Sequence, residues 1–147
     1  MHSPRIAPAA LEQALAVYRA NFKPSPRLAK PHVMLVLNVV AADTNVEAAR
    51  LFTTQQQAFV NLRRGRPGLV PPPLPSALAI DDFCTPQEKA GVDAALACAV
   101  VGARDAVRAG MQAFVQQHQP DELLLTANVF DHAARLRSFG LAMEAWG

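Results

Sequence analysis

The sequence predicts an α/β fold built around a parallel sheet, and two apolar segments carry most of that prediction. The segment HVMLVLNVVAA (32–42) is almost continuously apolar and contains four valines, and DELLLTANVF (121–130) is a second run of the same kind. Neither alternates regularly between apolar and polar residues, which is typical of strands covered on both faces. Segments with helical periodicity flank both runs, and this alternation of strand and helix favours a parallel sheet.

Four or five helices are expected around these strands. One face of the first, over residues 7–22, carries apolar residues at offsets of four, three and four: Leu11, Leu15, Tyr18 and Phe22. Thr44 and Glu47 have the spacing of a capping box, and Asp43 is another possible cap, so a helix is expected to begin here and run to about Arg64. Further helices are expected over residues 86–97, 103–118 and 131–146.

The remaining segments are a long loop and a short strand. Residues 65–86 contain six prolines and two glycines, which predicts a long loop of the kind that is often functional or mobile. The segment CAVVG (98–102) is expected to be a short strand or an extended turn. Two convincing strands and a short one leave edges and faces of a parallel sheet uncovered, so the sequence looks like part of something larger.

Length, charge and cysteine content narrow the class of protein. A chain of 147 residues is expected to form one domain with a real core. Its net charge of +2 is too mild to indicate nucleic-acid binding, and no apolar run is long enough for a membrane helix. Cys84 and Cys98 lack metal-ligand spacing, so no metal site is expected. The start of the chain lacks the apolar stretch of a signal peptide, and a cytoplasmic location is the default expectation.

Three phrases resemble the luciferase-like monooxygenases, which are flavin-dependent (β/α)8 (TIM) barrel oxidoreductases. They are VMLVLNVVAADTNVEAARLFTTQQQAFVNLRRGRPG (33–68), AALACAVVG (94–102) and DELLLTANVFDHAARLRSF (121–139). The resemblance extends from about Ala7 to Ala145, so residues 7–147 are taken as one partial domain that includes the proline-rich loop. Residues 1–6 do not continue the family pattern.

The resemblance concerns the C-terminal part of that family only. A barrel of this kind typically needs about 250 residues, so this chain would supply the last two barrel strands of an incomplete barrel. The resemblance implies reduced FMN as the cofactor and an organic substrate that is oxidised with O2. Because the early strands would be missing, the isolated chain is expected to have little activity. The expected partners are a second copy of the chain or the missing barrel half. The alternatives to a monooxygenase fragment are a non-catalytic oligomerising or binding module, and a gene fragment without a role.

Three polar residues on the two long strands are candidates for the cofactor site. Asn38 interrupts the first strand, and its amide must find hydrogen bonds, either in a barrel interior or within a satisfied core. Thr126 and Asn128 alternate with apolar neighbours, so they share one face that could point into a pocket.

Three further positions lie where strands or turns end. Gly102 ends a turn that, by the resemblance, could help to shape a flavin pocket, although Ala103 after it cannot cap a helix. Asp131 and His132 follow the last strand, at the end where barrel enzymes keep their chemistry. Asp131 fits a helix cap, and His132 is a candidate catalytic residue because a neutral histidine can act as a base or donate to a flavin.

Overall fold

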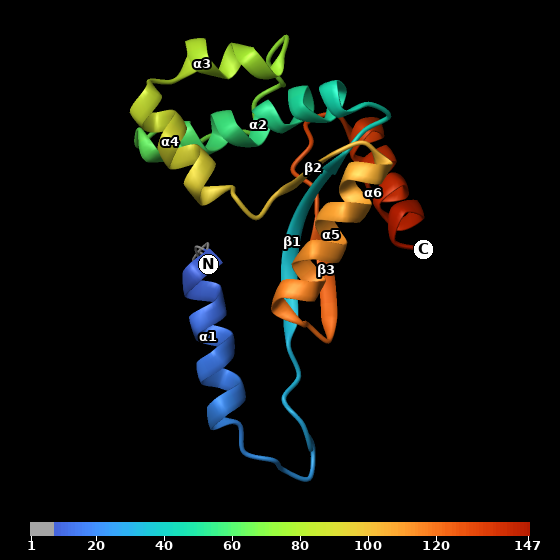
Figure 1. Ribbon diagram of the computed structural model, residues 1–147. Coiled ribbons are helices and arrows are strands. Elements are labelled where there is room, and N and C mark those ends of the chain that lie inside the picture. Colours follow the sequence, from blue (N-terminus) through green and yellow to red (C-terminus); the bar gives the residue numbers. More distant parts are fainter. Residues whose placement is uncertain (1–7) are drawn as a thin grey trace.

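The computed structural model describes residues 8–147, and the expected irregular start at residues 1–6 lies outside them. Within this range helical segments precede, separate and follow the strands (Figure 1). In chain order they are α1 (Pro8–Asn21), β1 (Met34–Ala41), α2 (Asn45–Arg63), the 3-10 turn η1 (Ala77–Ala79), α3 (Ile80–Phe83), α4 (Pro86–Ala95), β2 (Val100–Gly102), α5 (Arg104–His118), β3 (Glu122–Thr126) and α6 (His132–Trp146).

The strands form one parallel sheet in the order β2-β1-β3. β1 and β3 pair from Met34↔Glu122 to Asn38↔Thr126, so the two long strands lie side by side as predicted. β2 pairs only with residues 39–41 of β1. The amino-terminal half of β1 is therefore unpaired on the side away from β3.

One face of the sheet is covered along its length by α5 and α6. Leu37, Val39 and Ala41 point to this side and are at most 2% exposed. They form the main core with residues of both helices: Val107, Met111, Phe114, Leu141, Ala142 and Ala145. Since successive residues of a strand alternate between faces, the residues between these three lie on the opposite side of the sheet.

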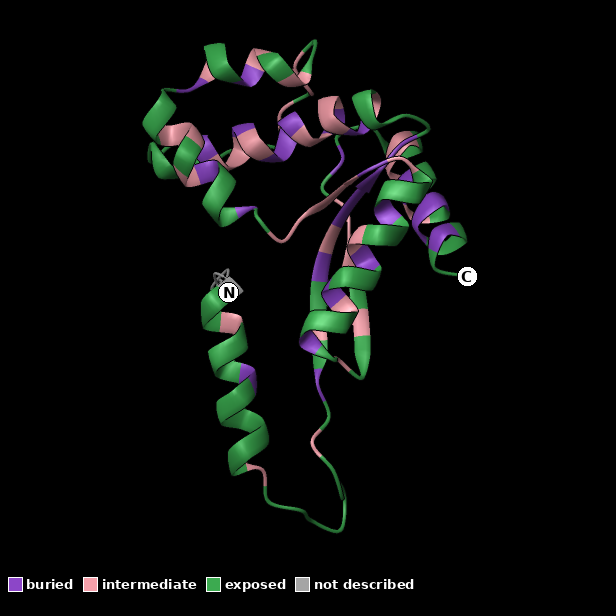
Figure 2. Ribbon diagram, in the orientation of Figure 1, coloured by how far each residue is buried: buried purple, intermediate pink, exposed green. Residues whose placement is uncertain are grey.

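That opposite face is covered only towards the carboxyl ends of the strands. There Val40 and Ala42 pack against Ala48 and Leu51 of α2. Towards the amino ends the same face is open, as the exposed lower parts of the strands in Figure 2 show. The apolar residues on this open part are at least half exposed: Met34, Val36 and Leu124.

Two predicted segments differ from the structure. The strand predicted over residues 121–130 ends at Thr126, because the chain then bends to bury Val129 against the α2 packing and to begin α6. The loop predicted over residues 65–86 contains η1 and α3. Ile80 explains that helical turn, because it is 3% exposed in a third apolar cluster shared by α2 and α4.

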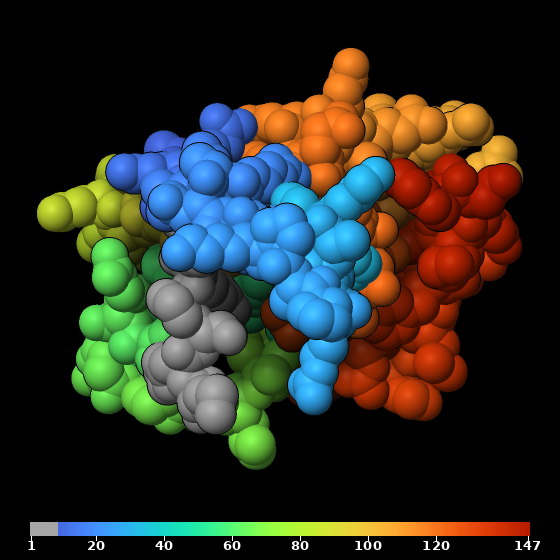
Figure 3. Space-filling view, turned by 90° about the horizontal axis from the view of Figure 1, so that it is seen from below, coloured from blue at the N-terminus to red at the C-terminus, as the bar shows by residue number. Residues whose placement is uncertain are grey.

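Helix α1 lies against the C-terminal end of α5 and is otherwise largely exposed (Figure 3). The Arg19 guanidinium donates to the carbonyl oxygens of His118 and Gln119, both at 2.8 Å. Leu15 is buried, whereas most of the other side chains of α1 are exposed. Polar contacts therefore contribute much of the attachment of this helix. Over residues 8–147 no helix is both long and apolar enough to cross a membrane.

Candidate functional site

A cavity of about 420 Å³ lies beside the unpaired edge of β1. This volume falls within the roughly 300–1,000 Å³ typical of small-molecule sites. Its lining residues come from α1, β1, α2, the α4–β2 connection, α5 and the end of β3: Leu11, Met34, Leu35, Val36, Leu37, Asn38, Gln55, Ala95, Leu96, Cys98, Ala99, Phe114, Thr126 and Asn128. Asn38, Thr126 and Asn128, the three strand candidates, thus line one cavity.

The polar part of the cavity wall lies where β1 and β3 run side by side. Asn38 and Thr126 are register partners, and Asn128 follows two residues later. The side-chain nitrogen of Asn38 donates to Oε1 of Gln55, which is 5% exposed on α2. Oδ1 of Asn38 is buried and has no hydrogen-bond partner among the described residues. Leaving such an acceptor unpaired costs about 1–3 kcal/mol.

The rest of the wall is apolar and neutral. Leu11, Leu96 and Phe114 contribute hydrocarbon surface. Burial raises the pKa of the Cys98 thiol, which keeps this side chain protonated and uncharged near neutral pH. Within the described residues the lining contains no Lys, Arg, Asp or Glu. The cavity therefore suits a neutral group with a few hydrogen-bonding atoms.

Gly102 lies outside this cavity and serves the packing of the β2–α5 turn. A Cβ at this position would lie 2.7 Å from Cβ of Ala106 and 2.9 Å from Oδ1 of Asn45. The same Oδ1 accepts a hydrogen bond from the backbone N–H of Ala103 at 2.7 Å. Asn45 thus binds the start of α5 from outside the helix, where Ala103 makes no side-chain cap. Sequence reasoning missed this contact because the two residues are far apart in the chain.

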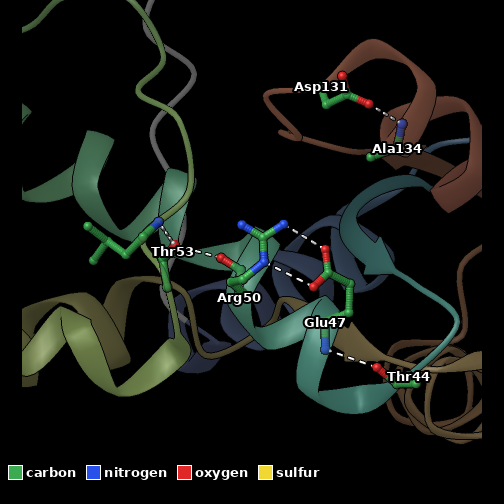
Figure 4. Close-up of polar contacts among 7 residues, drawn as sticks. Thr44, Glu47, Arg50, Thr53, Asp131 and Ala134 are labelled. Carbon is green, nitrogen blue, oxygen red and sulfur yellow. Dashed lines mark hydrogen bonds and ion pairs between the residues drawn. The ribbon is translucent and has the colours of Figure 1, made fainter.

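Asp131 and His132 also lie outside the cavity lining. Oδ2 of Asp131 accepts a hydrogen bond from the Ala134 N–H at 2.8 Å, which confirms the predicted helix cap (Figure 4). His132 is exposed in the first turn of α6, with Nδ1 2.9 Å from the Arg135 guanidinium. The structure therefore does not bring His132 together with the three polar residues of the strands.

The start of α2 uses only half of the predicted capping box. Oγ1 of Thr44 accepts from the Glu47 N–H at 3.1 Å, but the Glu47 carboxylate binds the Arg50 guanidinium at 2.7 Å (Figure 4). Hydrogen bonding from Arg50 lowers the pKa of Glu47. A complete capping box is found instead at α4, between Thr85 and Glu88.

No group of three or more His, Cys, Asp or Glu side chains suited to a metal ion occurs in the described part of the chain. The polar groups in the cavity lining are side-chain amides, the hydroxyl of Thr126 and the protonated thiol of Cys98.

Comparison with known proteins gives a consistent relationship. No family model matches the chain. A luciferase-like monooxygenase of Escherichia coli (strain K12) is 49% identical over 138 residues, which are 94% of this chain and 40% of that protein. The uncharacterized protein YvbT of Bacillus subtilis (strain 168) is 37% identical over 139 residues, 95% of this chain and 40% of YvbT. The crystal structure of apo-MsnO8 has a TM-score of 0.75 and 28% identity, over 92% of this chain and 41% of that one.

These matches identify an α/β chain whose fold corresponds to part of a larger protein fold. Over the matched residues the chain is related to the luciferase-like monooxygenases, which confirms the resemblance predicted from the sequence. The chain spans about 40% of the length of the curated relatives that it matches. This share agrees with the predicted fold class, an incomplete portion of a barrel with two main parallel strands.

Proposed function

We propose that this chain supplies one wall of the flavin site of a luciferase-like, FMN-dependent monooxygenase that oxidises an organic substrate with O2. The observation that carries the proposal is that Asn38, Thr126 and Asn128 line one and the same cavity, beside the paired strands β1 and β3. Its supporting context is the 49% identity to a luciferase-like monooxygenase. The cavity lies beside the amino-terminal half of β1 and reaches the carboxyl end of β3 at Thr126 and Asn128, the end of a strand at which barrel enzymes bind their ligands.

The residues present fit the ring system of a flavin. The hydroxyl of Thr126 and the side-chain amide of Asn128 would bond to oxygen or nitrogen atoms of the ring. The neutral lining does not fit the phosphate, which would lie outside this cavity. When bound, the reduced flavin would supply the electrons that activate O2 for oxidation of the substrate.

The chain's own residues would bind and orient the ring and exclude water from one side. Leu11, Leu96 and Phe114 provide the apolar surface for this task. Met34 and Val36 also line the cavity, yet each is 57% exposed. The cavity is therefore open on that side. We infer that the isolated chain binds flavin weakly and has little or no monooxygenase activity.

Flavin fluorescence quenching with the pure 147-residue chain tests this function. We expect saturable quenching of FMN by the wild-type chain and weaker quenching by Asn38→Leu, which removes the amide from the cavity wall. His132→Ala is the matched control, since His132 lies outside the lining, and its binding should equal that of the wild type. Absence of saturable binding would contradict flavin binding, and O2-dependent substrate oxidation at enzymatic rates by this chain would contradict the inactivity.

A second candidate function is a non-catalytic oligomerising or binding module. It is favoured by the open part of the sheet, where Met34, Val36 and Leu124 are exposed beside strand edges that could pair with another chain. Sedimentation velocity separates the two. A self-associating module should become monomeric on Val36→Lys, whereas a wild-type chain that is already monomeric at high concentration would remove a second copy as the partner.

A further inference from the structure

We propose that the exposed side of α6 is a self-association surface, on which α6 of a second copy of this chain packs antiparallel. We call this surface the α6 stripe and define it as Ala133, Leu136, Gly140 and Met143. None of these residues lines the cavity, so the inference goes beyond the proposed function and does not depend on it.

The α6 stripe has the spacing of a contact between two helices. Its residues follow one another at offsets of three, four and three, which places them along one side of the helix. Leu136 and Met143 are 58% and 63% exposed, and Ala133 and Gly140 are exposed as well. Alternating offsets of three and four between apolar residues also form the seam of a coiled coil. The α6 stripe therefore has the pattern of a covered helix face.

The other side of α6 is already buried within the chain. Its buried residues are Ser138, Leu141, Ala142 and Ala145, and the three apolar ones belong to the main core. Figure 1 shows α6 at the outer edge of the molecule, with α5 and the sheet on one side of it. A helix that is apolar on more than one side is typical of one packed on more than one side. A row of neighbouring exposed apolar residues marks a contact surface, whereas scattered single ones are ordinary.

Gly140, at the centre of the α6 stripe, is not required by the chain itself. Its φ lies outside the left-handed region that favours glycine. A Cβ built on it would meet no atom of the described residues within 4 Å. Glycine inside a helix is less favourable than alanine, so some other contact is needed to explain it. A residue without a side chain at the centre of an apolar stripe allows a second helix to approach closely.

The charges beside the α6 stripe favour a second copy as the partner. Arg137 and Glu144 lie on the same flank of the stripe, because seven residues are close to two helical turns. In an antiparallel pair with its two-fold axis near Gly140, Arg137 of each copy faces Glu144 of the other. Leu136 then faces Met143 of the second copy. A parallel pair would instead bring like charges together, which is unfavourable.

Arg137 has donors available for this contact. Its Nε and one terminal nitrogen donate to Oδ1 of Asp43 at 3.3 and 2.7 Å, and its side chain is 53% exposed. A guanidinium carries five N–H donors, so the bonds to Asp43 leave others free to reach Glu144 of a second copy. The contact with Asp43 also holds the Arg137 side chain beside the α6 stripe.

Sedimentation velocity of the pure 147-residue chain over a range of concentrations tests this surface. We expect a reversible equilibrium between monomer and dimer for the wild type. Gly140→Ala should weaken the dimer about tenfold, or about 1.4 kcal/mol, because two added methyl groups meet where the helices cross. The same change should raise the thermal stability of the monomer, because it removes a glycine from a helix. A variant that merely damaged the fold would lower this stability.

Gly91→Ala is the matched control for Gly140→Ala. Gly91 lies within α4, and a Cβ built there would also meet no atom within 4 Å. Gly91→Ala should therefore raise thermal stability in the same way and leave the dimer unchanged. Val36→Lys is a second control, because it alters the open part of the sheet and not α6. It should also leave the dimer unchanged.

Reversing the two charges tests the identity and the orientation of the partner. Glu144→Arg and Arg137→Glu each bring like charges together at both ends of the antiparallel pair, so each should weaken self-association about tenfold. A mixture of the two variants should restore the dimer, because each copy then faces the opposite charge at both positions. Circular dichroism shows whether each variant is folded.

Three results would overturn the inference. The first is a wild-type chain that remains monomeric at about 1 mM, where even a weak dimer is populated. The second is a dimer that dissociates on Val36→Lys but not on Gly140→Ala, which would place self-association on the sheet. The third is a mixture of folded charge variants that forms no more dimer than either variant alone. None of these measurements involves a flavin, so each result leaves the proposed flavin site in place.

Discussion

The two faces of β1 have nearly the same apolar composition and very different surroundings. Leu37 and Val39 on one face are 1% and 2% exposed beneath α5 and α6. Met34 and Val36 on the other face are each 57% exposed, although Val40 further along that face is fully buried under α2. Helices therefore cover one face of β1 along its length and the other face only towards the carboxyl end of the strand.

The apolar pattern of β1 suits a strand that is covered on both faces. The described residues cover one face along its length and the other only towards the carboxyl end of the strand. A strand without polar alternation is typical of a sheet buried on both sides. The cavity lies where the second covering ends, and Asn38 and Gln55 mark that boundary. The candidate ligand site thus adjoins the incomplete face at Met34, Val36 and Asn38, and Leu35, Leu37 and Phe114 line it from the covered side.

The largest expected effect separates the two faces directly. Leu37→Ala should lower the free energy of unfolding by about 2–5 kcal/mol, because it removes a fully buried side chain from the main core. Val36→Ala, one residue away on the open face, should change it by less than about 0.5 kcal/mol. Urea unfolding followed by circular dichroism measures both. A similar cost for the two changes would show that the open face is covered in solution.

Much of the covered face of the sheet could be predicted from the sequence. Little could be predicted of the region where the covering of the other face ends. The valine-rich run at 32–42 and the Asp131 cap are local patterns, and the structure confirms both. The end of β3 at Thr126 was not predictable, because the apolar run continues to Phe130 while Val129 packs against α2. The contact between Gln55 and Asn38 was not predictable for a similar reason, because it depends on which distant strand α2 contacts.

A second effect concerns a buried hydrogen bond on the covered face. Ser138 of α6 is 1% exposed, and its Oγ accepts from the Ala41 N–H at 2.9 Å. Ser138→Ala leaves this buried N–H without a partner and should cost about 1–3 kcal/mol. Ser76→Ala is the control, since Ser76 is exposed and makes no side-chain cap. If both variants unfold at the same urea concentration, the contact to β1 contributes nothing.

The third effect tests the start of α6, the helix that covers the main core. Asp131→Ala removes the acceptor for the Ala134 N–H and should cost about 0.5–2 kcal/mol. His132→Ala at the next position should change stability by less than about 0.5 kcal/mol, because His132 is exposed. Thermal unfolding of the two variants compares them. A larger loss from His132→Ala than from Asp131→Ala would reverse the assignment of cap and neighbour.

The smallest expected effect is a loss of stability in acid. It concerns the contact between α2, which covers part of the other face, and α4, which packs against α2. Hydrogen bonds from the Arg64 guanidinium and then from the Thr85 backbone lower the pKa of Glu88 from 4.5 to about 2. A carboxyl whose pKa is lower in the folded state stabilises fully above its unfolded value and loses that contribution as pH falls from 4.5 towards 2. Glu88→Gln should therefore flatten the pH dependence of stability in this range. Chemical unfolding at pH 7, 4 and 3 supplies the test. An unchanged slope in Glu88→Gln would mean that the ion pair between Arg64 and Glu88 does not form in solution.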